Sequence, residues 1–211
     1  MASDSVKRQS GKYFFPVVLL TVVVGLAGYF IFRSLPGESA LPVVKPAPDF
    51  EIENLDGQTV KASQNKGKIV LLEFMFTSCP DICPLTTYKM SKLQEQFKEK
   101  GLFGDRVRFV SITFDPEQDT PEVLRKYAQR MNIDFSGWDL WRGEEKQTIE
   151  IASKYGVTVQ NMGDGQFVHT VTSLNLIDAD QRIRKVYKMG DEMDNEEIIA
   201  DIASLLSESE R

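Results

Sequence analysis

Cysteine and histidine are scarce in this sequence: its 211 residues include two cysteines and one histidine. Structural zinc sites usually have four cysteine or histidine ligands, so a zinc site here would need a carboxylate as well. A framework of several disulfides is excluded, because two cysteines form at most one bridge. No cysteine lies in the N-terminal region, which excludes a lipid-modified cysteine there. Any thiol chemistry therefore depends on a single pair of cysteines.

An excess of positive charge is also missing. The formal net charge is −6, and the segment up to Arg33 holds four basic residues and one acidic residue, so the remainder carries −9. This balance argues against nucleic acid as a partner and against a basic surface that docks on membranes. It is compatible with a cationic partner, although an acidic surface is more often simply a solvated one.

No charged residue occurs over the twenty residues from Tyr13 to Phe32. At about 1.5 Å per residue, a helix of this length spans the roughly 30 Å hydrocarbon core of a bilayer. The apolar region of a cleaved signal peptide is usually about 7–15 residues long and ends at a site of small residues, whereas Arg33 follows directly here. We therefore expect a retained transmembrane anchor at residues 13–33.

Basic residues are more frequent before this segment than after it: Lys7, Arg8 and Lys12 precede it, and Arg33 alone follows it closely. The positive-inside rule then predicts a cytoplasmic N-terminus at residues 1–12 and a C-terminal domain on the outer side. The N-terminus lacks the Arg- and Ser-rich pattern of an organelle transit peptide. A bacterial inner membrane, with the domain facing the periplasm, is the simpler expectation.

Residues 34–49 contain four prolines and predict a stiff tether, and residues 50–211 predict one α/β domain. The expected elements of this domain are a hairpin at 50–60, a buried strand at 69–76, a helix at 85–100, a buried strand at 107–114, helices at 121–131 and 144–155, a hairpin at 171–187 and a helix at 195–206. Continuous apolar runs that alternate with helices indicate a sheet covered on both faces. We predict a thioredoxin-like fold with a central mixed sheet flanked by helices, preceded by one N-terminal transmembrane helix.

The two cysteines lie where the first buried strand ends and a helix begins, in the sequence FMFTSCPDICP from Phe74 to Pro84. A proline follows each cysteine, so both cysteines are expected to be extended, in a tight loop. Pro84 suits the first turn of the helix, which puts Cys83 at or beside the N-cap, where the helix dipole favours a thiolate and lowers its pKa. Cys79 and Cys83 can then form a disulfide or bind a soft metal.

His169 precedes the second hairpin, in a loop that should face the cysteine loop of a thioredoxin-like sheet. A lone histidine is more often a structural or surface residue than a ligand. Its predicted position allows a second interpretation, in which His169 joins Cys79 and Cys83 in a three-coordinate site that suits Cu(I) and can still hold Cu(II). Zinc remains an alternative if a carboxylate completes the ligand set.

Other polar and sulfur-containing side chains lie near this motif. Asp115 and Asp119 follow the neighbouring strand and could tune the site, but turn and helix-capping roles are the alternative, which we favour for Asp119 beside the helix start. Asp81 could accept hydrogen bonds from local backbone N–H groups. Three methionines could offer thioether sulfur, although core filling is more common. They are Met75, Met90 and Met162.

The sequence resembles the Sco proteins, also called SenC-type proteins, which are membrane-anchored copper proteins that serve the assembly of cytochrome c oxidase. The resemblance covers residues 50–206. It rests on four features: TSCPDICP at Thr77–Pro84, SITFDPEQDTPE at Ser111–Glu122, DLWRG at Asp139–Gly143, and a histidine 86 positions after the second cysteine. The resemblance implies that Cys79, Cys83 and His169 are copper ligands in a thioredoxin-like domain.

The chain departs from related patterns at several positions. Family members commonly carry an aspartate directly before the histidine, but here Val168 precedes it and Thr170 follows, so a carboxylate partner for the imidazole is missing at that position. Thioredoxin-type reductases have two residues between their cysteines, whereas this chain has three. A peroxiredoxin would have a threonine three residues before its reactive cysteine, where this chain has Phe76.

The first functional hypothesis, from this resemblance, is a membrane-anchored copper chaperone, more an assembly factor than an enzyme. It would accept copper from an upstream donor and deliver it to the dinuclear copper centre of cytochrome c oxidase subunit II, by exchange at a surface-accessible site. The alternative is a thiol-disulfide oxidoreductase that reduces the target's cysteines before metallation, with Cys83 as the thiol of lower pKa. Replacement of His169 by alanine should separate the two. A copper or redox sensor is a third hypothesis, for which the sequence shows no signalling partner.

Overall fold

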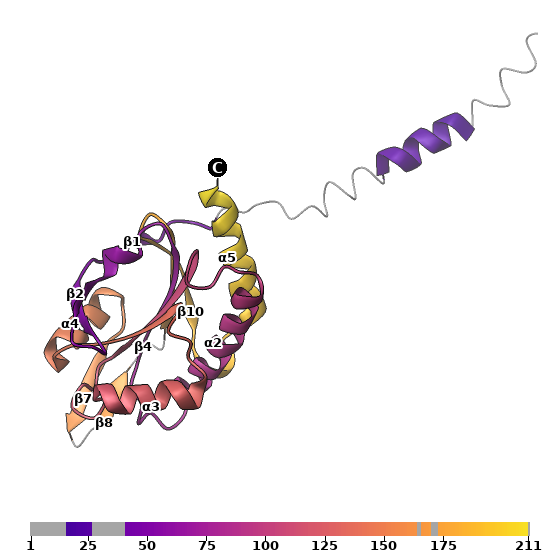
Figure 1. Ribbon diagram of the computed structural model, residues 1–211. Helices are drawn as coiled ribbons and strands as arrows, with labels where there is room; N and C mark the ends of the chain where they lie inside the picture. The colour runs from indigo at the N-terminus through magenta and orange to yellow at the C-terminus, as the bar shows by residue number, and fades with distance from the viewer. Residues whose placement is uncertain (1–15, 27–40, 164–165, 170–172, 211) are drawn as a thin grey trace, which may run out of the picture. The chain divides into compact units, whose positions relative to one another are not determined.

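The computed structural model describes residues 16–26, 41–163, 166–169 and 173–210 (Figure 1). The chain divides into two compact units, Met1–Ser39 and Ala40–Arg211. In the first unit, residues 16–26 form a helix whose side chains are all exposed. The rest of the predicted anchor, residues 13–15 and 27–33, lies outside the described residues. Among the helices that are described, none is both long and apolar enough to cross a membrane.

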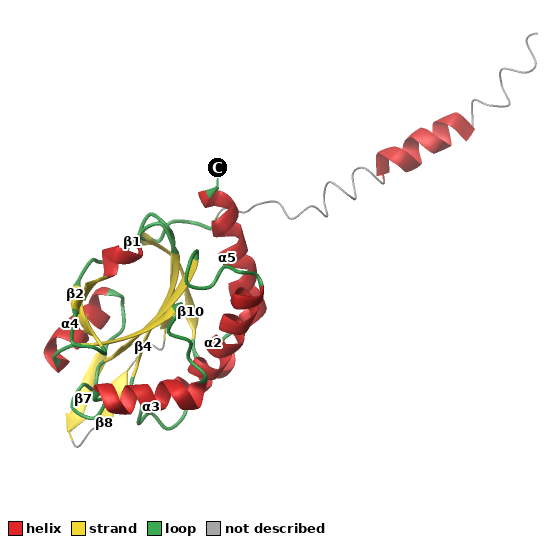
Figure 2. Ribbon diagram, viewed as in Figure 1, coloured by secondary structure: helices red, strands yellow, loops and turns green. Residues whose placement is uncertain are grey.

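The second unit is a mixed α/β domain, in whose described residues a curled sheet of eight strands has the order β1-β10-β9-β4-β5-β6-β2-β3 (Figure 2). Its strands are β1 (Lys45–Pro46), β2 (Glu51–Asn54), β3 (Thr59–Lys61), β4 (Ile69–Met75), β5 (Val107–Thr113), β6 (Trp138–Arg142), β9 (Ser173–Ile177) and β10 (Arg182–Lys188). β4, β5 and β6 run parallel, whereas β9 is antiparallel to β4. A separate two-stranded sheet pairs β7 (Val159–Gly163) with β8 (Gln166–His169). The predicted mixed central sheet is therefore confirmed.

Helices cover both faces of the eight-stranded sheet. They are α2 (Ile82–Glu99), α3 (Pro121–Met131), α4 (Glu145–Lys154) and α5 (Asn195–Ser209), with short 3-10 helices η1 (Ala62–Asn65) and η2 (Gly190–Glu192). α2 packs against α3 and α5, and α4 lies on the other side of the sheet (Figure 2). β4 is buried along its whole length, as its continuous apolar run predicts.

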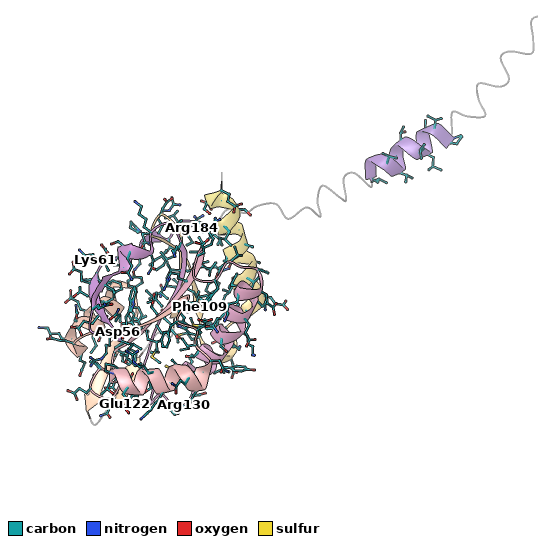
Figure 3. The ribbon with its side chains drawn as sticks, viewed as in Figure 1. Asp56, Lys61, Phe109, Glu122, Arg130 and Arg184 are labelled. Carbon is teal, nitrogen blue, oxygen red and sulfur yellow. The ribbon has the colours of Figure 1, made fainter. Side chains whose placement is uncertain are left out.

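Aromatic contacts show which strand residues face which helices. Phe74 of β4 faces the α4 side, where its ring centroid lies 5.7 Å from that of Tyr155. Phe109 of β5 faces α2, where it lies 6.4 Å from the ring of Phe97, and it occupies the centre of the domain (Figure 3). Alternate residues of a strand point to opposite faces of the sheet, so Phe74 and Phe109 mark the α4 face and the α2 face respectively.

Both predicted hairpins, both long buried strands and the helices α3, α4 and α5 are confirmed, with small shifts at their ends. α2 begins at Ile82, three residues before the predicted start, because a proline is tolerated in the first helical turn, where backbone N–H groups have no partner within the helix. The sequence did not predict β6, whose apolar pattern Asp139 and Arg142 interrupt. β1 lies within residues 34–49, the predicted tether, and pairs with β10, so this part of the predicted tether belongs to the sheet.

Candidate metal and thiol site

Cys79 and Cys83 lie at the carboxyl end of β4, where the chain turns into α2. The Cys79 N–H donates to the Phe76 carbonyl at 3.3 Å. Cys83 is the second residue of α2, two positions after the N-cap, so the prediction of an extended backbone at Cys83 is wrong, whereas its predicted position at the start of the helix is nearly correct. Asp81 is the N-cap, but its side chain makes no capping hydrogen bond, and the predicted turn role of this carboxylate is not seen. Both sulfurs are thiols, and no disulfide joins them.

The two thiols are in contact with each other and are nearly buried. Cys79 is 7% exposed and Cys83 is 1% exposed. A side-chain hydrogen bond with Cys79 and the burial of the sulfur both raise the pKa of the Cys83 thiol above its ordinary value. Both effects act against the helix dipole, which by itself would lower the pKa of Cys83 as the sequence predicts. The expected surface-accessible site is also not observed, and access to the sulfurs requires local movement.

A buried carboxylate holds the start of the cysteine loop, residues 76–81. Asp119 is 0% exposed, and it accepts the Thr77 N–H at 3.2 and 3.1 Å together with the hydroxyl groups of Thr77 and Thr113. Thr120 caps α3, as the sequence predicts, by accepting the Val123 N–H at 3.3 Å. The capping role favoured for Asp119 is therefore wrong, since its oxygens are used by the cysteine loop and by the end of β5.

The other predicted residues have structural roles. Asp115 takes part in a turn, where its Oδ1 accepts the Gln118 N–H at 3.4 Å, and burial raises the pKa of its carboxyl. Met75 and Met90 are 0% exposed in the hydrophobic core, which confirms the core-filling interpretation for both. The side chain of Met162 lies outside the described residues.

A buried polar cluster on the α2 side of the sheet was not predicted from the sequence. Glu73 of β4 is 0% exposed, and its Oε1 accepts the Ser111 hydroxyl at 2.6 Å. The Ser111 oxygen in turn accepts the Trp138 indole N–H at 2.8 Å. The Glu73 Oε2 has no hydrogen-bond partner, and burial raises the pKa of Glu73 to about 7. The signal in the sequence is a single charged residue in the middle of the apolar run IVLLEFM.

A second buried polar contact, between Thr87 and Tyr127, connects α2 to α3. The Thr87 hydroxyl donates to the Cys83 carbonyl at 2.9 Å, and its oxygen lies 2.8 Å from the hydroxyl oxygen of Tyr127. Burial raises the pKa of Tyr127, and the charge of Glu73 raises it further. Cys83 therefore lies above a polar interior rather than a purely apolar one.

His169 lies in strand β8, whereas the sequence predicts a loop. Its Cα pairs with that of Val159 in β7, and its side chain and residues 170–172 lie outside the described residues. β9 begins four residues later at Ser173 and is antiparallel to β4, so it begins near the end of the sheet where β4 ends. Four residues span at most about 14 Å, which limits the separation of the two backbones. Among the described side chains, no group of three or more histidine, cysteine, aspartate or glutamate residues is arranged to hold a metal.

Comparison with known proteins gives consistent matches. The SCO1/SenC family model matches residues 42–207. The SCO1 protein homolog of Bacillus subtilis (strain 168) is 30% identical over 192 residues, which are 88% of this chain and 97% of that protein. The structure of BsSco, a member of the Sco family of cytochrome c oxidase assembly proteins with an identified disulfide switch, has a TM-score of 0.67 at 30% identity and covers 77% of this chain and 95% of that chain.

A solved structure with bound copper is also similar. It is Arabidopsis thaliana ScoI, with a TM-score of 0.64 at 25% identity, covering 76% of this chain and 98% of that chain. The α/β sheet flanked by helices thus matches solved Sco structures over most of their length. Because the family model covers most of this sequence, the chain belongs to the SCO1/SenC family.

Proposed function

We propose that this protein is a membrane-anchored assembly factor that delivers copper to the dinuclear copper centre of cytochrome c oxidase subunit II. The observation that carries this proposal is the pair of thiols, Cys79 and Cys83, which are in contact at the carboxyl end of β4 with no disulfide between them. Thiolate sulfur is a soft ligand that favours Cu(I). The copper bound to Arabidopsis thaliana ScoI and the assembly role of the family of BsSco support the proposal.

The proposed ligands are Cys79, Cys83 and His169. Two thiolates and an imidazole suit Cu(I) and can still hold Cu(II). The short connection from β8 to β9 supports the third ligand, because β9 pairs with the strand that leads to the cysteines. A ring nitrogen has to approach a copper ion to about 2 Å, a typical metal–nitrogen distance, so the proposal requires the imidazole beside both sulfurs.

The two sulfurs differ in exposure, and this sets the order in which ligands of the target replace them. Copper binding displaces the thiol protons, including the proton that the hydrogen bond with Cys79 holds on Cys83. At 7% exposure, Cys79 is nearer the surface than Cys83, at 1%. An incoming cysteine thiolate of the target therefore replaces Cys79 first, while Cys83 retains the ion until a second target ligand binds.

The proposal places residues 13–33 in a bacterial inner membrane, with the N-terminus in the cytoplasm and the domain on the periplasmic side. The uncharged run of twenty residues and the basic residues that precede it support this orientation. Fractionation of cells and protease treatment of intact spheroplasts test it. We expect the full-length protein in the membrane fraction and its domain open to an external protease.

Metal analysis of the full-length protein in detergent, after reduction without oxygen, tests the copper assignment. We expect about one copper ion per chain in the wild type and none in the Cys79→Ser/Cys83→Ser variant, which has lost both soft ligands. His169→Ala should bind copper at least about tenfold more weakly. Equal copper in the wild type and the double-serine variant would contradict the proposal.

A second candidate function is reduction of the target's cysteines before metallation. The hydrogen-bonded thiol pair and the disulfide switch identified in BsSco favour it. His169→Ala discriminates between the two functions, since a dithiol needs no imidazole to exchange with a disulfide. Normal oxidase assembly in cells that carry this variant, together with weak copper binding by the purified protein, would favour the reductase.

A further inference from the structure

Asp119 is buried beside the start of α3, and a capping role for that helix does not account for its position. Its side chain is 0% exposed, and its two oxygens accept hydrogen bonds from the Thr77 N–H, the Thr77 hydroxyl and the Thr113 hydroxyl. Thr120 already supplies the cap of α3. A buried carboxylate is unfavourable unless several donors satisfy it. The donors that satisfy Asp119 come from the cysteine loop and from the end of β5.

These bonds connect two segments that are far apart in the sequence. Thr77 lies 42 positions before Asp119 and only two positions before Cys79. Thr113 is the last residue of β5, and it is paired with Met75, the last residue of β4. Asp119 therefore ties the cysteine loop to the neighbouring strand just where the sheet ends.

Cys83, the second cysteine of the motif, lies in the first turn of α2, and this helix is held by η2. The Gly190 N–H donates to the Thr86 hydroxyl oxygen at 2.8 Å, one turn after Ile82 in α2. Cys83 is thus positioned by the helix and by η2, whereas Cys79 lies in the loop that Asp119 holds. The distance between the sulfurs depends on both supports.

We propose that Asp119 is a positioning residue for the thiol pair: its carboxylate fixes Thr77, and through it the position of Cys79 relative to Cys83. The part of this proposal that concerns copper rests on the proposed function, and the part that concerns the disulfide does not. In this role the Asp119 carboxylate neither binds the metal nor donates a proton. Its carboxylate oxygens accept hydrogen bonds from three donors, the Thr77 N–H and the hydroxyl groups of Thr77 and Thr113.

The test compares Asp119→Ala with Thr120→Ala in the full-length protein. Thr120→Ala is the matched control, because it removes the cap of α3 at the adjacent position and leaves the bonds to the cysteine loop in place. Two quantities are measured: copper affinity, by competition with a chelator, and the equilibrium constant for forming the Cys79–Cys83 disulfide in glutathione buffers. Thermal melting measures stability separately.

We expect Asp119→Ala to weaken copper binding about 10–100-fold, as loss of a group that orients a ligand usually does. It should also lower the equilibrium constant for disulfide formation at least about threefold, because a loosened loop reduces the effective concentration of one thiol near the other. Thr120→Ala should lower the melting temperature by a few degrees and change both constants less than about twofold.

Two further variants keep the proposal falsifiable if Asp119→Ala does not fold. Asp119→Asn retains an oxygen for the Thr77 N–H and should restore most of both constants. Thr77→Val removes one of the three donors and should weaken copper binding in the same direction as Asp119→Ala, but less. Wild-type constants in Thr77→Val, or equal changes in the Asp119 and Thr120 variants, would overturn the proposal.

The two proposals fail in distinguishable ways. If the wild type binds no copper, the proposed function is wrong, and the disulfide equilibrium still measures the effect of Asp119 on the thiol pair. If the wild type binds copper and neither constant depends on Asp119, the positioning role is wrong and the proposed function is unaffected.

Discussion

Replacement of Glu73 by glutamine should stabilise the reduced, copper-free protein at high pH and change it little at low pH. The Glu73 carboxyl is 0% exposed, accepts one hydrogen bond from Ser111 at 2.6 Å, and has no partner at Oε2. Glutamine has nearly the shape of a protonated glutamate and keeps an oxygen that accepts the Ser111 hydroxyl. The substitution therefore removes the charge with little change in packing.

The structure sets the size and direction of this effect. Burial raises the pKa of Glu73 from its ordinary value of 4.5 to about 7. Between these values the folded protein keeps a proton that the unfolded chain has lost, so the free energy of unfolding falls as pH rises through this window. One pKa unit corresponds to about 1.4 kcal/mol, so the loss is about 3 kcal/mol once pH exceeds 7. Glu73→Gln should therefore be more stable than the wild type by about 3 kcal/mol at pH 8, and similar to it at pH 4.5.

Urea unfolding at a series of pH values measures this difference, provided that the slope against urea is the same in both proteins. Glu122→Gln is a suitable control, because Glu122 is exposed and its hydrogen bond and ion pair with Lys126 lower its pKa. That variant should gain no stability as pH rises. A difference between wild type and Glu73→Gln that stays constant from pH 4.5 to pH 8 would refute the reasoning, since it would mean that Glu73 does not change its protonation in this range.

Two further substitutions test the packing around the site and the sheet edge. Gly190→Ala should lower the free energy of unfolding by about 1–3 kcal/mol, because φ is +66° there and a Cβ would lie 2.7 Å from the Ile82 Cγ1. Gly57→Ala is the control in urea unfolding, since Gly57 has a similar φ of +73° but a Cβ there would meet no atom within 4 Å. The difference between the two variants measures the cost of the contact with Ile82. Arg184→Ala, at a residue labelled in Figure 3, should destabilise the domain by about 3 kcal/mol in the same assay. The Arg184 side chain is 3% exposed and pairs with buried Asp178 at 2.9 Å, so its removal leaves a buried carboxylate without this partner. A loss below about 1 kcal/mol would show that the remaining neighbours of Asp178 compensate.

Local patterns were sufficient for much of the fold. The apolar runs of β4 and β5 predicted strands buried on both faces, and the Thr-Pro pair at Thr120 and Pro121 predicted the start of α3 at the correct residue. The position of the cysteines after β4 followed from the same patterns. These features depend on periodicity, capping and proline geometry, which act over a few neighbouring residues.

Other properties of the site were decided by contacts between distant segments. The helix dipole alone predicts an acidic Cys83, but burial and the hydrogen bond with Cys79 reverse the direction of its pKa shift. The role of Asp119 changes for a similar reason, because two of its three donors belong to Thr77, 42 positions away, and the third is the Thr113 hydroxyl. Hydrogen-bond partners and burial depend on how the strands and helices pack against each other. For this reason the chemistry of the thiol pair became visible only in the tertiary structure, whereas its location was already clear from the sequence.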